Sequence, residues 1–194
     1  MVRQIGILIH VSKEHRSFLS IIDKDNGKFS ATASRSDISR GSLISYSLNQ
    51  RGTKSYITSI DVLDLPEIEN EHDLLFFHQV LEIVYYFIPF GKSVPDIFYL
   101  LLYLYSSIER INSDALKKMF LFKLFAHLGF YPEEKRKYYS LFTTIRMGNI
   151  DDIICRKVDL SLERKLDRWL DYCISLHPCT KYFNAISMFM SRKP

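Results

Sequence analysis

The spacing of the apolar residues changes near Pro66, and this change constrains the fold more than any other feature. Before Pro66 the apolar side chains alternate, as Ile5, Ile7 and Ile9 do, and a period of two predicts a strand with one buried face. After Pro66 the apolar residues of 74–88 recur at intervals of three and four, the spacing of a helix. The chain therefore predicts an α+β fold, with strands in residues 1–66 and a helical domain in residues 67–194.

The first part of the chain predicts five short strands. Asn26-Gly27 is a strong hairpin signal because both residues tolerate a positive φ. Five strands joined without long crossovers predict a small closed barrel, and an N-terminal five-stranded OB-type β-barrel is the natural candidate. The pattern alone is also compatible with an SH3-like barrel. The predicted strands are residues 5–11, 17–23, 28–35, 43–48 and 55–65.

Helix boundaries in the second part are marked by capping and breaking residues. Pro89 and Gly91 end the first helix, and Pro95 suits the first position of the second. Ser113 can cap a third helix that ends at Gly129. Further helices are predicted over residues 133–147, 161–177 and 181–190.

Charge is unevenly distributed along the 194 residues. Residues 1–66 carry nine Lys/Arg against six Asp/Glu, residues 67–114 carry two against eight, and residues 115–194 carry fifteen against eight. Two basic segments thus flank an acidic one, within a net charge of +4. This arrangement suits an anionic partner that contacts both ends of the chain.

Signatures of catalysis, metal binding and membrane insertion are missing from the sequence. The six histidines show no HxxxH or HExxH spacing, and neither a GxSxG motif nor a P-loop occurs. The three cysteines form no CxxC pair, which argues against zinc and against a disulfide framework. The apolar run 5–9 is too short for a signal peptide, and residues 74–90 include three polar residues, as a buried helix would. We expect a cytoplasmic protein that is not an enzyme and holds no cofactor or metal.

Basic residues gather at or near the predicted strand ends and turns. An OB barrel binds single strands with a basic groove for phosphates and with aromatic platforms for bases. Of the available aromatics, Phe29 is expected to pack in the core, Tyr46 and Tyr56 suit packing and stacking equally, and Phe18 is a further candidate. The predicted DNA-binding residues are Lys24, Lys28, Arg35, Arg40, Arg51 and Lys54.

Three segments resemble the RecO family in their order and spacing. Residues 22–31 (IDKDNGKFSA) are similar to the strand, Gly-Lys turn and small-residue strand of the RecO N-terminus. Residues 77–84 (FHQVLEIV), followed by Phe90 and by residues 95–101, resemble the first two helices of the family's second domain. Residues 120–132 (FLFKLFAHLGFYP) are similar to its helix with a Leu-Gly-aromatic-x-Pro ending.

The resemblance implies a non-enzymatic mediator of DNA repair and homologous recombination. RecO proteins bind single- and double-stranded DNA, anneal complementary strands, bind the acidic C-terminal tail of SSB and, with RecR, load RecA on SSB-coated DNA. Two features depart from the family. The segment after the Leu-Gly turn has no CxxC pairs for zinc, and the loop 34–42 is short, with two arginines. A structural adaptor without DNA activity and a degenerate nuclease or transferase remain the alternatives.

A receptor for the SSB tail needs an apolar groove with cations at its rim. Both kinds of residue occur in the third predicted helix. The same apolar stripe also suits a core-facing helix with solvated lysines. The predicted partner-binding residues are Lys117, Lys118, Phe120 and Lys123.

Overall fold

The computed structural model describes residues 3–12, 18–34, 37–52, 54–130, 143, 160–180 and 183. The chain divides into two compact units, Met1–Ser106 and Ser107–Pro194. The first unit contains all five strands and the first two helices, so it extends beyond the change from strands to helices at Pro66. Its elements are β1 (Gln4–Ser12), β2 (Phe18–Asp23), β3 (Gly27–Ala33), β4 (Leu43–Arg51), β5 (Lys54–Asp64), α1 (Glu71–Phe87) and α2 (Pro95–Ser107).

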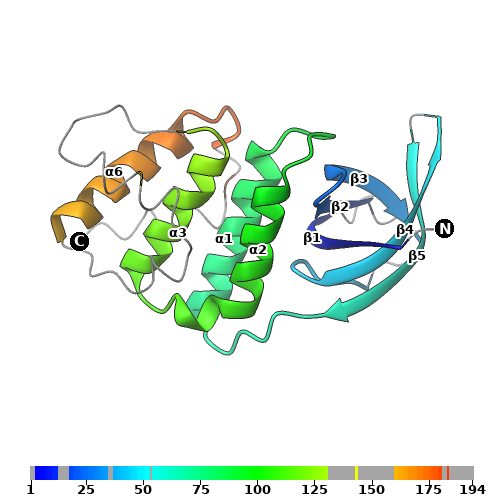
Figure 1. Ribbon diagram of the computed structural model, residues 1–194, viewed down its shortest axis with the longest axis horizontal. Helices are drawn as coiled ribbons and strands as arrows, with labels where there is room; N and C mark the ends of the chain where they lie inside the picture. The colour runs from blue at the N-terminus through cyan, green and yellow to red at the C-terminus, as the bar shows by residue number, and fades with distance from the viewer. Residues whose placement is uncertain are drawn as a thin grey trace. The chain divides into compact units, whose positions relative to one another are not determined.

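The five strands form one closed barrel in the order β1-β2-β3-β5-β4 (Figure 1). β4 pairs with β1 and closes the sheet, and only the β3–β5 pairing is parallel. The predicted α+β class with a five-stranded barrel is confirmed. Closure removes most of the sheet edges that would otherwise invite pairing with other chains, although β3 and β5 pair only at Thr32 and Ala33 in the described residues.

The barrel interior is filled by alternate residues of every strand. Phe29 packs against this core, as predicted, with its ring centroid 5.7 Å from that of Tyr46. Tyr46 is itself completely buried, so it belongs to the core and offers no platform on the surface. The buried members of the core are Leu8, Leu19, Ile21, Ala31, Ala33, Ile38, Ile44, Tyr46 and Ile57.

The turn between β4 and β5 is shorter than the sequence predicts. Polar residues 49–54 indicated a loop, but the strands continue to Arg51 and resume at Lys54, which face each other across the pair. Gly52 has a φ of +61°, which permits a tight connection. The polar residues are therefore exposed strand positions, because this end of the hairpin has no core to face.

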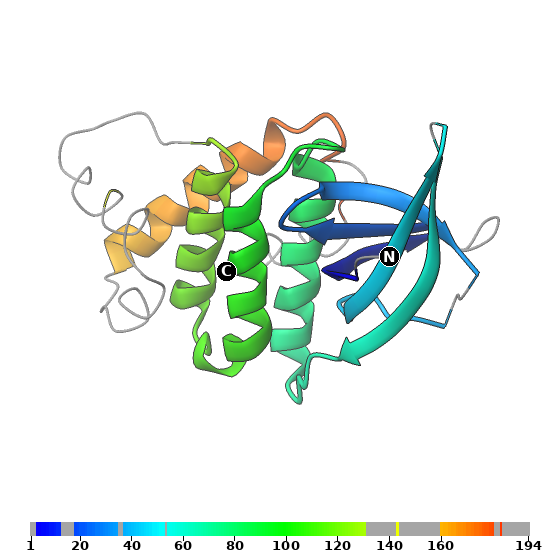
Figure 2. The same cartoon turned by 45° about the vertical axis from the view of Figure 1, so that its right-hand side comes forward.

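Helix α1 covers part of the outer surface of the barrel. Ile7 of β1 pairs with Ile22 of β2, and because their neighbours Leu8 and Ile21 lie in the core, both point out of the barrel, yet both are buried. Helix α1 packs against β1 (Figure 2). Asn70 caps this helix, since its Oδ1 accepts from the His72 amide at 2.8 Å. The helix ends before Pro89, as predicted.

The second unit contains the short 3-10 helix η1 (Ile108–Arg110) and the helices α3 (Asp114–His127) and α6 (Leu160–Ser175). Ser113 caps α3 by accepting from the Leu116 amide at 3.3 Å, as predicted. The ring of Phe122 in α3 packs against that of Trp169 in α6 in a tilted arrangement, with ring centroids 4.7 Å apart. The helices predicted over 133–147 and 181–190 lie almost wholly outside the described residues, as does Cys155.

Across the described ranges, every helix is too short or too polar to cross a lipid bilayer.

Candidate nucleic-acid interface

Two exposed aromatic side chains lie on the outer surface of the barrel, separated by one small residue. Phe18 of β2 pairs with Thr32 of β3, and Thr32 pairs with Tyr56 of β5. Their chain neighbours Leu19 and Ile57 point into the core, so all three residues point outward. Phe18 is 49% exposed and Tyr56 is 36% exposed. We call Phe18, Thr32 and Tyr56 the aromatic row.

The outward face next to the aromatic row is accessible on β3 but not on β2. Ser20 and Ser30 form the next outward pair, with their hydroxyl oxygens 2.9 Å apart. Ser30 is exposed, whereas Ser20 is only 5% exposed. The accessible polar surface beyond the aromatic row is therefore that of Ser30.

Two predicted cations lie close to the aromatic row. Lys54 precedes Tyr56 by two positions on β5 and therefore shares its face, and Arg51 is its partner across the hairpin. Both are exposed. No Asp or Glu occurs between residues 38 and 60, so this part of the chain is purely cationic. The hairpin thus combines positive charge with an exposed aromatic ring.

Lys28 is placed differently from the prediction, because it is buried rather than presented to solvent. Its exposed fraction is 3%, and its Nζ donates to the carbonyl oxygen of Tyr85 in α1. The same nitrogen lies 4.2 Å from the ring centroid of Phe90 and 5.3 Å from that of Tyr85. Burial lowers the pKa of Lys28 to about 8. In this position Lys28 joins β3 to α1 instead of contacting a phosphate.

Replacing Lys28 with Met should change how stability depends on pH. The pKa of Lys28 is about 8 in the folded protein against an ordinary 10.5. Between these values the unfolded chain binds more protons, so this lysine makes the free energy of unfolding rise with pH. From pH 7.5 to pH 10 the parent should gain about 1–2 kcal/mol relative to Lys28→Met. Urea unfolding of both proteins at the two pH values measures these free energies of unfolding. An equal change with pH in the parent and in Lys28→Met would contradict the role assigned to Lys28.

The remaining predicted cations divide into three cases. Arg40 is half-buried and its Nη2 donates to the carbonyl oxygen of His78 at 3.1 Å, so it too supports the contact with α1. Lys24 is exposed in the β2–β3 turn, 3.9 Å from the carboxylate of Asp25. Arg35 lies outside the described residues. The structure therefore brings together Arg51 and Lys54 at one end of the face and leaves Lys24 at the other.

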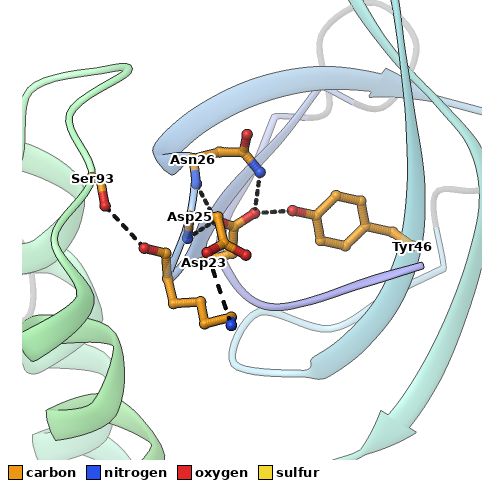
Figure 3. Close-up of polar contacts among 6 residues, drawn as sticks. Asp23, Asp25, Asn26, Tyr46 and Ser93 are labelled. Atoms are coloured by element: carbon orange, nitrogen blue, oxygen red, sulfur yellow. Dashed lines mark hydrogen bonds and ion pairs between the residues drawn. The ribbon is translucent and has the colours of Figure 1, made fainter. Parts of the chain in front are cut away.

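The β2–β3 turn is stabilised by the buried carboxylate of Asp23, a role that was not predicted from the sequence (Figure 3). Asp23 Oδ1 accepts from the backbone amides of Asp25 at 2.8 Å and Asn26 at 2.5 Å. Its Oδ2 accepts from Asn26 Nδ2 at 2.7 Å and from the hydroxyl of Tyr46. Burial, with the neighbouring Asp23 carboxylate, raises the pKa of Tyr46, which keeps the phenol protonated as a donor. An Asp at the start of a turn sequence is the signal that could have predicted this role.

The predicted partner-binding residues lie on α3 in the second unit. Phe120, Lys117 and Lys123 are buried. Lys118 Nζ lies 2.8 Å from a carboxylate oxygen of Glu163 and 2.8 Å from one of Asp167, both on α6. Burial opposes the charge of Lys118, but the two carboxylates outweigh it and raise its pKa. These contacts hold α3 and α6 together, and the described residues form no exposed groove of Phe120 and lysines.

No protein-family model and no curated protein matches the sequence. The function of the chain must therefore be inferred from the geometry of the barrel.

Proposed function

We propose that this protein binds single-stranded DNA on the outer face of β2, β3 and β5, as an OB-type barrel does. The observation that carries this proposal is the aromatic row, in which Phe18 and Tyr56 flank Thr32 beside the exposed cations Arg51 and Lys54. Single strands bind where aromatic rings stack on bases and cations follow the phosphates. Both elements occur here within one continuous surface.

The position of the row on the barrel supports the same function. OB-type barrels bind oligonucleotides on the face of strands 2 and 3 and with the loops that join strands 1 to 2 and 4 to 5. Phe18 begins β2, Thr32 lies near the end of β3, and Arg51 and Lys54 flank the β4–β5 turn. The aromatic row therefore supports a ligand surface at the place where an OB-type barrel would have it.

In the cell, we propose a role as a RecO-like mediator of DNA repair and recombination. The support for this part is the resemblance of residues 22–31, 77–84 and 120–132 to that family. Binding of double-stranded DNA, of RecR and of the SSB tail belongs to the same proposal. The tail site on α3 stays a prediction that the burial of Phe120 does not favour. An adaptor without DNA activity is the alternative, and the absence of oligonucleotide binding would favour it.

Removing both aromatic rings should strongly weaken DNA binding. Stacking contributes about 1–3 kcal/mol per base, so Phe18→Ala/Tyr56→Ala should bind an oligothymidine of about twelve nucleotides at least about 30-fold more weakly. Arg51→Ala/Lys54→Ala should instead reduce the salt dependence of binding. The slope of the logarithm of the binding constant against the logarithm of the salt concentration should fall by about 0.7 for each lost phosphate contact. Fluorescence anisotropy at two salt concentrations measures both effects.

Ile5→Ala is the matched control for this experiment. Ile5 is 51% exposed, as much as Phe18, but it lies on β1, away from the aromatic row. It should bind the oligonucleotide as the parent does. Equal affinity of the parent and the folded double variant would contradict the proposed surface. A parent that does not bind even at low salt would exclude DNA binding by this protein.

A further inference from the structure

Phe90 is an exposed aromatic residue that the connection between α1 and α2 places beside β3. Its backbone forms a parallel bridge with Lys28, and the amide of the following Gly91 donates to the Lys28 carbonyl oxygen at 2.8 Å. The side chain of Phe90 is 59% exposed. A loop between two helices thus adds an aromatic ring to the border of the barrel.

The barrel has room for this loop because β3 and β5 pair over a short length. Their register covers Thr32 and Ala33 of β3 in the described residues, at one end of the strand. At the other end, the edge of β3 near Lys28 is occupied by Phe90 and Gly91. Phe90 therefore extends the sheet at the end opposite the aromatic row.

Lys28 and the β2–β3 turn fix the position of this loop. The Lys28 ammonium lies 4.2 Å from the Phe90 ring centroid, a cation–π contact. Ser93 Oγ donates to the Lys24 carbonyl oxygen at 2.9 Å (Figure 3). The ring remains more than half exposed although Lys28 contacts it, so ring surface remains for a second partner.

We propose that Phe90 is a second stacking platform for the same nucleic acid, so that the bound single strand runs from the aromatic row past Ser30 and along the edge of β3 to Phe90. Lys28 and Thr32 are four residues apart, which separates Phe90 from the aromatic row by about 13 Å at the rise of a β-strand. Ser30 lies between the two ends and is exposed, whereas its partner Ser20 is buried. This inference rests on the proposed single-strand binding and adds its path and its second contact.

The charges near Phe90 favour a nucleic acid over an apolar peptide. Lys92 lies two residues after Phe90, and Lys24 lies in the turn that Ser93 contacts; both lysines are exposed, as are the carboxylates of Asp25 and Asp96. Phosphates that follow β3 would therefore meet cations at both ends of the path, Arg51 and Lys54 at one and these lysines at the other. An apolar peptide, which has no phosphates, would gain no binding free energy from these lysines and arginines.

Three substitutions of Phe90 separate stacking from structural support. Phe90→Leu keeps an apolar side chain over Lys28 but has no flat π face, whereas Phe90→Trp keeps one. Phe90→Ala and Phe90→Leu should bind a twelve-nucleotide oligothymidine about 5- to 150-fold more weakly than the parent, the range expected for one lost stack. Phe90→Trp should bind as the parent does, and its added indole fluorescence should be quenched by the oligonucleotide. Tyr99→Ala, which removes a 56% exposed ring from α2, is the matched control and should be neutral.

The possible results either support or overturn this inference. If Phe90→Leu bound the oligonucleotide as the parent does, the inference would be overturned, even if Phe90→Ala bound weakly. Such a result would mean that residue 90 acts only by covering Lys28 and not by stacking on a base. An indole in Phe90→Trp that the oligonucleotide does not quench would overturn it as well. If Phe18→Ala/Tyr56→Ala weakens binding while the Phe90 variants do not, the role of Phe90 is rejected and the proposed single-strand binding at the aromatic row stands. If the parent itself binds no oligonucleotide, both fail together.

Discussion

Asp23→Ala is expected to lower the free energy of unfolding of the first unit by about 3–5 kcal/mol. The carboxylate is 2% exposed and accepts from two backbone amides, the Asn26 side chain and the Tyr46 hydroxyl. Hydrogen bonds to charged groups contribute about 1.5–3 kcal/mol each, and a buried donor left without an acceptor costs about 1–3 kcal/mol. The phenol of Tyr46 would be such a donor, because it is completely buried.

Asp25→Ala provides the matched control, since Asp25 belongs to the same turn but its carboxylate is exposed. It should change the free energy of unfolding by less than about 1 kcal/mol. Urea titrations followed by circular dichroism measure both variants, and Tyr46→Phe completes a double-mutant cycle. A coupling energy near zero between Asp23 and Tyr46, or equal losses in the two Asp variants, would contradict the role assigned to Asp23.

Gly27→Ala should be comparably damaging, for a steric reason. A Cβ at this position would lie 1.8 Å from the carbonyl oxygen of Lys92 and 2.4 Å from its carbonyl carbon. Both are backbone atoms, so no rotation of a side chain relieves the overlap. The φ of +67° adds the cost of a left-handed conformation, about 1–2 kcal/mol. With about 1–3 kcal/mol for the overlap, the loss should reach about 2–5 kcal/mol.

Gly52→Ala separates these two contributions. Gly52 has nearly the same conformation, with a φ of +61°, but nothing lies within 4 Å of its added Cβ. Only the conformational cost should remain, and thermal unfolding of the two variants should show the difference. Similar losses in Gly27→Ala and Gly52→Ala would mean that the turn and the Lys92 backbone do not pack together as described.

The spacing of apolar residues was sufficient to predict where the strands and most described helices lie. Alternation identified the strands because one face of each meets the barrel core, and Ser113 and Gly129 identified the ends of α3 through local backbone chemistry. The length of the β4–β5 turn was misjudged because exposed strand residues and loop residues have the same polar composition. Local patterns thus predicted the elements better than their exact ends.

The candidate site was only partly predictable, because a sequence pattern shows which way a side chain points and not what covers it. Lys28 and Lys54 both point outward from the barrel, but α1 covers Lys28 and leaves Lys54 exposed. The same reasoning separates buried Tyr46 from exposed Tyr56. Phe90 entered the sequence analysis only as part of the family resemblance, since its position beside β3 depends on a long-range pairing.

The burial of the outward-facing Ile7 and Ile22 bears on how such a barrel can be inherited or transplanted. A barrel whose outer surface were polar all round could be moved as a cassette into other chains by recombination of gene segments. Here the gene segment for the strands alone would carry two large apolar side chains without their cover. The piece that could be transplanted with its apolar surface covered is therefore the barrel together with α1.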